Sequence, residues 1–179
     1  MGHHFKKTAN KDLGRKSVEE IQATKKLPLV IVLDNIRSMH NVGSAFRTSD
    51  AFLVRKIYLT GITATPPHRD INKTALGATE SVAWEYVEST RVAVKRLKED
   101  GYTIVSVEQA EPHISLEKLT LGKNKKYCLV FGNEVSGVSD EVVGLSDFCL
   151  EIPQSGTKHS LNISVSVGIV LWHFYNIFR

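Results

Sequence analysis

The chain has 179 residues, of which 42% are hydrophobic and 23% charged, and its formal net charge is +4. These values are typical of one globular domain and exclude a low-complexity or disordered chain. The excess positive charge lies in residues 1–26, because residues 27–179 carry equal numbers of acidic and basic side chains. We therefore divide the chain into a basic N-terminal arm with a short helix, residues 1–26, and a domain, residues 27–179.

Strands and helices are expected to alternate along the domain. Apolar runs rich in Val, Ile and Leu predict the strands, and capping residues followed by helical periodicity predict the helices. In chain order the expected elements are a helix from the Ser17 capping box to before Pro28, a strand at 29–33, a helix at 41–54, a strand at 56–60, a loop at 61–80 with a short helix near 73–76, a helix at 90–100, strands at 102–107 and 127–131, a short helix at 139–144, a strand at 149–152, and a long terminal helix capped by Ser160.

This pattern predicts the α/β class. Uninterrupted apolar strands are buried on both faces, which indicates a mostly parallel sheet with helices on both faces. Ligands of such sheets bind beyond the carboxyl ends of the strands. Polar, glycine-bearing segments follow several of the expected strands there, and we expect the site among them: 34–43, 107–110, 132–137 and 153–160.

The location and the redox state of the chain are predicted from its apolar segments. The first 26 residues contain no apolar stretch of the kind found in a signal peptide. Polar residues such as Asn162 and His173 interrupt the run 161–178, which favours a buried helix over a membrane span. Cys128 and Cys149 lie in apolar runs without a neighbouring ligand cluster, so we expect reduced thiols in a cytoplasmic protein.

Common nucleotide and metal signatures are missing from the sequence. No expected strand leads into GxGxxG or a Walker A motif, and the segment Gly132–Gly137 has the spacing of neither. The motifs HExxH and GxSxG and a cluster of metal ligands are also missing. The sequence therefore disfavours an NAD-dependent or NTP-hydrolysing enzyme, and we expect no metal.

Three motifs carry a specific resemblance. They are Asn41–Thr48 (NVGSAFRT), Leu129–Val138 (LVFGNEVSGV), and Ile152–Gly156 (IPQSG) followed by Ser160–Ser166 (SLNISVS). In this order and spacing they resemble the motifs of the SpoU (TrmH-like) family of RNA ribose 2′-O-methyltransferases, in the SPOUT superfamily. The resemblance covers about residues 28–175 and departs at Gln154, where the family usually has methionine.

The resemblance implies properties that periodicity does not reveal. It implies a SPOUT fold whose C-terminal segment forms a deep trefoil knot, with S-adenosylmethionine bound in the knot. It also implies a homodimer that pairs through the first and last helices of the domain. The implied reaction transfers a methyl group to a ribose 2′-hydroxyl of tRNA or rRNA.

The resemblance assigns Arg47 to the ribose hydroxyl and its adjoining phosphate. A guanidinium with a pKa above about 12 is a poor base, so we favour positioning and charge stabilisation over deprotonation. Asn41 is expected to reach an RNA phosphate, although capping its own helix is the alternative. Glu134 is expected to hold Arg47 or a loop at the dimer interface, although a solvated carboxylate is the alternative.

Two polar residues beside Leu161 complete the implied reaction centre. Ser160 and Asn162 would place Arg47 and the ribose, and Asn162 would be a buried amide in need of partners. Neutral-range titration makes His40 and His159 alternative bases, which the family does not require. The implied cofactor-binding residues are Val107, Glu108, Gly132, Ile152 and Leu161.

Two other functions stay open at this point. A non-catalytic RNA-binding module would explain the basic arm, which suits a polyanionic partner. An RNA base methyltransferase of a related knotted branch is the nearer alternative, and the Ser160-Leu161-Asn162 motif favours ribose over it. Binding of S-adenosylmethionine would separate the first alternative from an enzyme.

Overall fold

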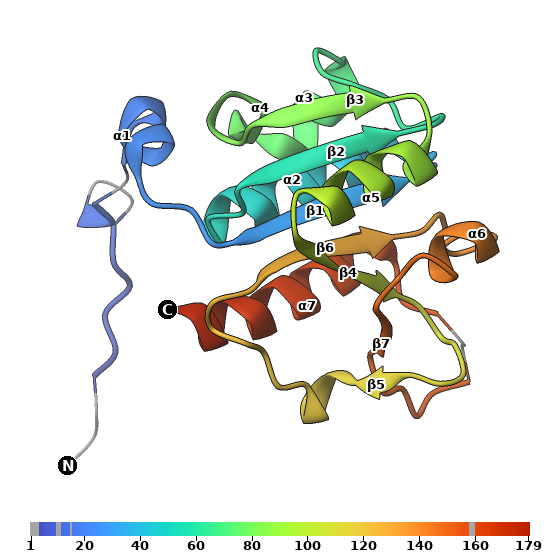
Figure 1. Cartoon of the computed structure of the whole chain (residues 1–179). Helices are drawn as coiled ribbons and strands as arrows, with labels where there is room; N and C mark the ends of the chain where they lie inside the picture. The colour runs from blue at the N-terminus through green and yellow to red at the C-terminus, as the bar shows by residue number, and fades with distance from the viewer. Residues whose placement is uncertain (1–3, 10–11, 15, 158–159) are drawn as a thin grey trace.

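A computed structural model of the chain describes residues 4–9, 12–14, 16–157 and 160–179. One twisted sheet runs through the domain, with helices packed on its two faces (Figure 1). All strand pairings between its seven strands are parallel, and their order is β3-β2-β1-β6-β4-β7-β5. The strands are β1 (Leu29–Asp34), β2 (Lys56–Thr60), β3 (Trp84–Val87), β4 (Tyr102–Val107), β5 (Ile114–Ser115), β6 (Lys126–Phe131) and β7 (Phe148–Glu151).

Two apolar cores lie on opposite faces of this sheet. Alternate residues of a strand point to opposite faces, so Ile31 of β1 joins one core and Val32 joins the other. The larger core packs against α2 (Met39–Ala51), α3 (Arg69–Ala75), α4 (Ala78–Ser81) and α7 (Ile163–Phe178). The smaller core packs against α5 (Thr90–Glu99) and α6 (Asp140–Val143). The prediction of an α/β fold with a parallel sheet and helices on both faces is confirmed.

Two short strands and a short 3-10 helix were not predicted. Strand β3 lies at one edge of the sheet, where only the last of its four residues is buried, so it lacks the continuous apolar run of the central strands. Strand β5 has two residues at the opposite edge and leads directly into η2 (Leu116–Lys118). Edge strands half open to solvent carry weaker sequence patterns than buried ones. The sequence pattern therefore predicts neither strand.

Helix boundaries differ from the prediction where a different residue supplies the cap. Ser38 accepts from the backbone N–H of Asn41, so α2 begins at Met39, and Asn41 is inside the helix. The helix ends at Ala51 because Leu53 adopts a left-handed backbone with φ 55°. The short helix expected near 73–76 runs from Arg69 to Ala75. The alternative in which Asn41 caps its own helix is therefore wrong.

The N-terminal arm contacts the domain through α1 (Val18–Ala23). Ser17 and Glu20 form the predicted capping box, in which Glu20 N–H donates to Ser17 Oγ at 3.2 Å and Ser17 N–H donates to Glu20 Oε2 at 2.6 Å. Gln22 Nε2 donates to the carbonyl oxygen of Glu80 at 2.8 Å. These contacts place the helical part of the arm beside α4, and the division at residue 26 stays a prediction.

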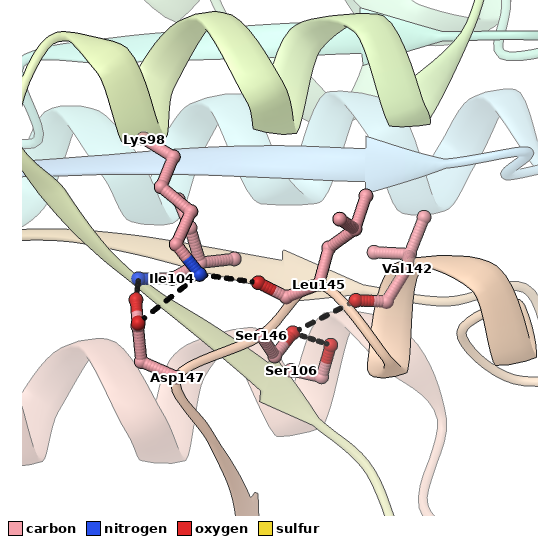
Figure 2. A network of polar contacts seen from close by, with 7 residues as sticks. All are labelled: Lys98, Ile104, Ser106, Val142, Leu145, Ser146 and Asp147. Atoms are coloured by element: carbon pink, nitrogen blue, oxygen red, sulfur yellow. Dashed lines mark hydrogen bonds and ion pairs between the residues drawn. The ribbon is translucent and has the colours of Figure 1, made fainter.

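Polar contacts fasten the start of β7 to β4, as Figure 2 shows. Ile104 N–H of β4 donates to Asp147 Oδ2 at 2.7 Å, and Lys98 Nζ of α5 lies 3.2 Å from Asp147 Oδ1. The hydroxyls of Ser106 and Ser146 are hydrogen-bonded at 2.8 Å. Strand β7 has only four residues, so this network sets its position beside β4 and carries the chain toward the carboxyl edge of the sheet.

Both cysteines are buried free thiols, as predicted. Burial raises the pKa of the Cys128 thiol and that of the Cys149 thiol, which keeps both protonated at neutral pH.

The apolar helix α7 has 16 residues, and no helix in the described part of the chain is long and apolar enough to cross a membrane. The trefoil knot implied by the resemblance stays a prediction.

Candidate functional site

A cavity of about 570 Å³ lies where β4, β6 and β7 end and α7 begins. This is the carboxyl edge of the sheet, where the sequence predicts the site. The wall combines backbone of the β6–α6 loop with apolar side chains from β7 and α7. Its lining includes eight predicted site residues, Val107, Glu108, Gly132, Glu134, Ile152, Ser160, Leu161 and Asn162.

The loop Gly132–Val138, which follows β6, is held in shape by its own hydrogen bonds. Asn133 and Gly137 exchange two backbone hydrogen bonds, at 3.2 and 3.0 Å. The side chain of Asn133 accepts from the N–H groups of Val135 and Ser136, both at 2.8 Å. A Cβ on Gly132 would overlap the backbone of Gly137, so only glycine fits there. The space beside Gly132 is thus filled by the loop's own backbone.

The Glu108 carboxylate, at the end of β4, is bound by this loop. Its Oε2 accepts from the N–H of Val138 at 2.8 Å, and its Oε1 accepts from the N–H of Gln109 at 2.9 Å. A Cβ on Gly137 would overlap Glu108 Oε2, and the backbone there is left-handed with φ 65°. Glu108 therefore lines the cavity as predicted, with both carboxylate oxygens already accepting backbone hydrogen bonds.

Glu134 connects the loop to α2. Its Oε1 accepts from Asn41 Nδ2 at 2.7 Å, across 93 residues of sequence. Arg47 lies further along the same helix, exposed, and makes no hydrogen bond or ion pair within the described residues. The expectation that Glu134 holds Arg47 is not met in this structure, where Asn41 is its partner. Asn41 lies in the first turn of α2, and Arg47 lies six residues further along the helix, about 9 Å along its axis.

The first residues before α7 form the opposite wall of the cavity. Asn162 caps the helix, because its Oδ1 accepts from Ser164 N–H at 2.8 Å and from Ser164 Oγ at 2.6 Å. The prediction that Ser160 caps this helix is therefore wrong, and so is the prediction of a buried Asn162, which is exposed. An amide that caps a helix at the mouth of a cavity finds its partners locally. His159 lies outside the described residues.

The cavity is acidic. Three carboxylates line it, those of Glu108, Glu134 and Glu151, and no lysine, arginine or histidine belongs to its described lining. The rest of the wall combines apolar side chains such as Ile152 and Leu161 with uncharged polar residues such as Gln154. Such a cavity suits a ligand with an apolar or aromatic part and a positive charge. The described residues include no group of three or more acidic, cysteine or histidine side chains that could hold a metal ion.

Sequence reasoning missed part of the lining. Glu151 is the last residue of β7, and Gln109 follows Glu108, so both lie at strand ends that the parallel-sheet argument already points to. Ile163 and Ser166 lie on the first turn of α7, one helical turn apart. Arg47 and Asn41 are the predicted residues outside the lining, and Asn41 reaches it through Glu134.

Comparisons with known proteins agree on one family. The model of the SpoU rRNA methylase family matches residues 28–172. A tRNA (guanosine(18)-2′-O)-methyltransferase of Borreliella burgdorferi is 33% identical over 144 residues, which are 80% of this chain and 64% of the relative. The enzyme of the same name from Aquifex aeolicus is 32% identical over 88% of this chain and 73% of its own length.

Solved structures show the same fold. The crystal structure of the TrmH/SpoU tRNA modifying enzyme of A. aeolicus superposes with a TM-score of 0.79 at 27% identity, over 89% of this chain and 80% of that one. An AdoMet-bound rRNA methyltransferase from Sinorhizobium meliloti has a TM-score of 0.80 at 23% identity, over 89% of this chain and 60% of that one. The chain thus spans between about three fifths and four fifths of the proteins it matches.

Proposed function

The chain belongs to the SpoU rRNA methylase family, and on that basis we propose that it transfers a methyl group from S-adenosylmethionine to a ribose 2′-hydroxyl of tRNA or rRNA. One observation carries the proposal: residues of the second and third motifs line one acidic cavity at the carboxyl edge of the sheet, and Asn41 of the first motif is hydrogen-bonded to Glu134 in its wall. Relatives named for tRNA and for 23S rRNA guanosine 2′-O-methylation match the chain. Their names support the reaction, and they leave both RNA classes as candidates.

The cavity fits S-adenosylmethionine in size, shape and charge. Its volume of about 570 Å³ is in the range of small-molecule sites. Ile152 and Leu161 would pack against the adenine, Gly132 and Val107 would offer backbone groups, and the negative charge of the three carboxylates in the lining would attract the positive charges of the cofactor through space. When bound, the cofactor supplies an electrophilic methyl group on a sulfonium. This chemistry needs no metal.

The protein's own contribution is to place the ribose. Arg47 lies six residues after Asn41 on α2, about 9 Å along the helix axis, and its guanidinium has no hydrogen-bond or ion-pair partner in the part of the chain that the structure describes. A free guanidinium at an exposed position can bind the phosphate beside the target nucleotide and stabilise charge that develops on the ribose oxygen. Asn41 and Glu134 fix the start of α2 against the cavity. Ser160 and Asn162 flank the opening on the other side.

The proposal is tested by methyl transfer from labelled S-adenosylmethionine to separated, unmodified tRNA and rRNA, followed by nucleoside analysis. A labelled 2′-O-methylnucleoside from one fraction is the expected result, and it identifies the RNA class. A labelled base would assign the chain to RNA base methylation instead. Cofactor binding without transfer to either fraction would contradict the proposed substrates.

We further propose that the basic arm binds the RNA backbone in a cytoplasmic setting. Deleting residues 1–16 removes five lysines and arginines and one aspartate, and it leaves the Ser17 capping box of α1 intact. We expect weaker RNA binding and a flatter dependence of log K on log salt, by up to about 0.9 for each lost phosphate contact. Cofactor affinity should not change. Filter binding between 50 and 200 mM salt measures the effect.

A shorter deletion is the matched control for the arm. Removing residues 1–5 deletes no lysine, arginine, aspartate or glutamate, so it should leave the salt dependence of RNA binding as it is in the full chain. If the 1–16 deletion also leaves that slope unaltered, the arm does not bind the RNA backbone.

An exposed apolar stripe on α7 supports the proposed homodimer. Val165, Ile169 and Trp172 share one side of the helix and are exposed by 48%, 37% and 51%. Trp172 also packs against Phe52 at the end of α2, with ring centroids 5.7 Å apart, so the apolar surface continues from α7 to α2. Apolar surface of this kind is commonly an interface, and a two-fold pair of identical helices would cover it.

Trp172→Glu is therefore expected to yield a monomer. A charge in the middle of an apolar interface has no partner, so light scattering should report about half the mass of the wild-type protein. Val92→Glu is the control, because Val92 is 50% exposed on α5, on the opposite face of the sheet. A dimer that persists in Trp172→Glu would contradict pairing through α7.

A further inference from the structure

Glu108 belongs to the cavity lining, yet both of its carboxylate oxygens are hydrogen-bonded to the protein backbone. One oxygen accepts from Val138 N–H and the other from Gln109 N–H. Charged acceptors form the stronger hydrogen bonds to backbone N–H groups. The side chain is thereby held against the far end of the Gly132–Val138 loop, where the chain leaves the cavity toward α6.

The loop is shaped to receive this carboxylate. Gly137 has a left-handed backbone and no room for a Cβ, because Glu108 Oε2 occupies that space. Gly137 is also the partner of Asn133 in the backbone bridge that closes the loop. Glu108 therefore acts on both ends of the loop at once, through the side chain at Val138 and through the bridge at Asn133.

The same loop also connects the cavity wall to α2. Glu134 lies between Asn133 and Gly137 and accepts from Asn41 Nδ2 at 2.7 Å. Asn41 and Arg47 share α2. A continuous series of contacts thus runs from β4 through Glu108, the loop and Glu134 to the helix of Arg47.

We infer that Glu108 is a positioning residue for methyl transfer, which fixes the Gly132–Val138 loop and through it the Glu134–Asn41 contact. The inference rests on the proposed function. It adds a residue that lines the cofactor cavity and affects how the RNA is positioned. It also separates Glu108 from residues that would hold the cofactor directly. Misplacement of reacting groups by about 1 Å can cost roughly 100-fold in rate, so a loop anchor can affect turnover strongly.

Glu108→Gln is the test variant. Glutamine keeps the shape but has a single acceptor oxygen, so one of the two N–H groups loses its partner and faces an NH₂ donor. The amide hydrogen of Val138 should exchange about tenfold faster or more, as measured by NMR. Turnover at saturating cofactor and RNA should fall about tenfold or more, while the Kd for S-adenosylmethionine stays within about threefold.

A double-mutant cycle separates positioning from a general loss of structure. Asn41→Ala should cost less turnover in the Glu108→Gln background than in the wild type, by about threefold or more, because the loop no longer holds Glu134 against Asn41. Glu111→Gln is the matched control, since Glu111 lies in the same β4–β5 connection with its side chain 88% exposed. It should leave turnover and Val138 exchange unchanged.

Unchanged exchange at Val138, or independent effects of the two substitutions on turnover, would overturn the inference. A large loss of cofactor affinity with unchanged exchange would make Glu108 a direct cofactor ligand instead. The exchange measurement requires no RNA substrate. Its result therefore stands apart from the proposed function, which fails only if the wild-type protein transfers no methyl group to ribose.

Discussion

Replacing Arg47 with lysine is expected to lower the rate of methyl transfer by about 100-fold or more. Lysine keeps the charge but loses the planar fork that binds a phosphate through two parallel hydrogen bonds. Arg47 is exposed and lies outside the cavity lining, so the affinity for S-adenosylmethionine should be unchanged. Single-turnover transfer to unmodified RNA, together with calorimetric titration of the cofactor, measures both quantities.

Arg91→Lys provides the control for this experiment. Arg91 Nε pairs with Glu141 Oε1 at 2.8 Å on the α5–α6 side of the sheet, and both side chains are at least half exposed. The same substitution there should change turnover little, because exposed ion pairs contribute about 1 kcal/mol or less. If Arg47→Lys retains most of the wild-type rate, then the guanidinium does not position the ribose or its phosphate.

Gly132→Ala is expected to abolish cofactor binding at concentrations that saturate the wild type. The added Cβ would overlap the carbonyl carbon of Gly137 and the backbone nitrogen of Val138. These are backbone atoms, so no change of side-chain rotamer can relieve the overlap. The loop must then move from β6, and the cavity wall moves with it. Overpacking of this kind costs about 1–3 kcal/mol of stability. Cofactor titration and thermal unfolding measure the two effects.

Gly144→Ala is the comparison for Gly132→Ala. A Cβ on Gly144 would lie 3.4 Å from the nearest atom, the carbonyl oxygen of Asp140, and the backbone there is already right-handed helical. This variant should bind the cofactor as the wild type does. Wild-type cofactor affinity in Gly132→Ala would show that the loop can open without affecting the cavity, contrary to the geometry described above.

The sequence predicts the central part of this fold well because that part is buried on both sides. The six residues of β1 are all buried, and a run such as Leu29–Leu33 leaves few alternatives to a central parallel strand. The carboxyl edge of the sheet then follows, and with it the position of the cavity. Edge strands β3 and β5 escaped prediction, since neither has a continuous apolar run.

The sequence predicts which residues belong to the site better than it predicts which of them are in contact. The family motifs locate Glu134 and Asn41, but only the fold shows that the two side chains meet over 93 residues. Helix ends are uncertain by one or two residues in a sequence, which is why the cap was predicted at Ser160 and is found at Asn162. The hydrogen bonds of Glu108 to a loop 30 residues away have no local sequence signal.

The acidic wall of the cavity also bears on how the site is emptied. Loss of the methyl group turns the positively charged sulfonium into a neutral thioether, and the three carboxylates keep their charge. The electrostatic attraction that favours the methyl donor is therefore weaker for the spent molecule. In a site of this composition, methyl transfer itself lowers the affinity for the bound product. This favours both release of the product and binding of a new methyl donor.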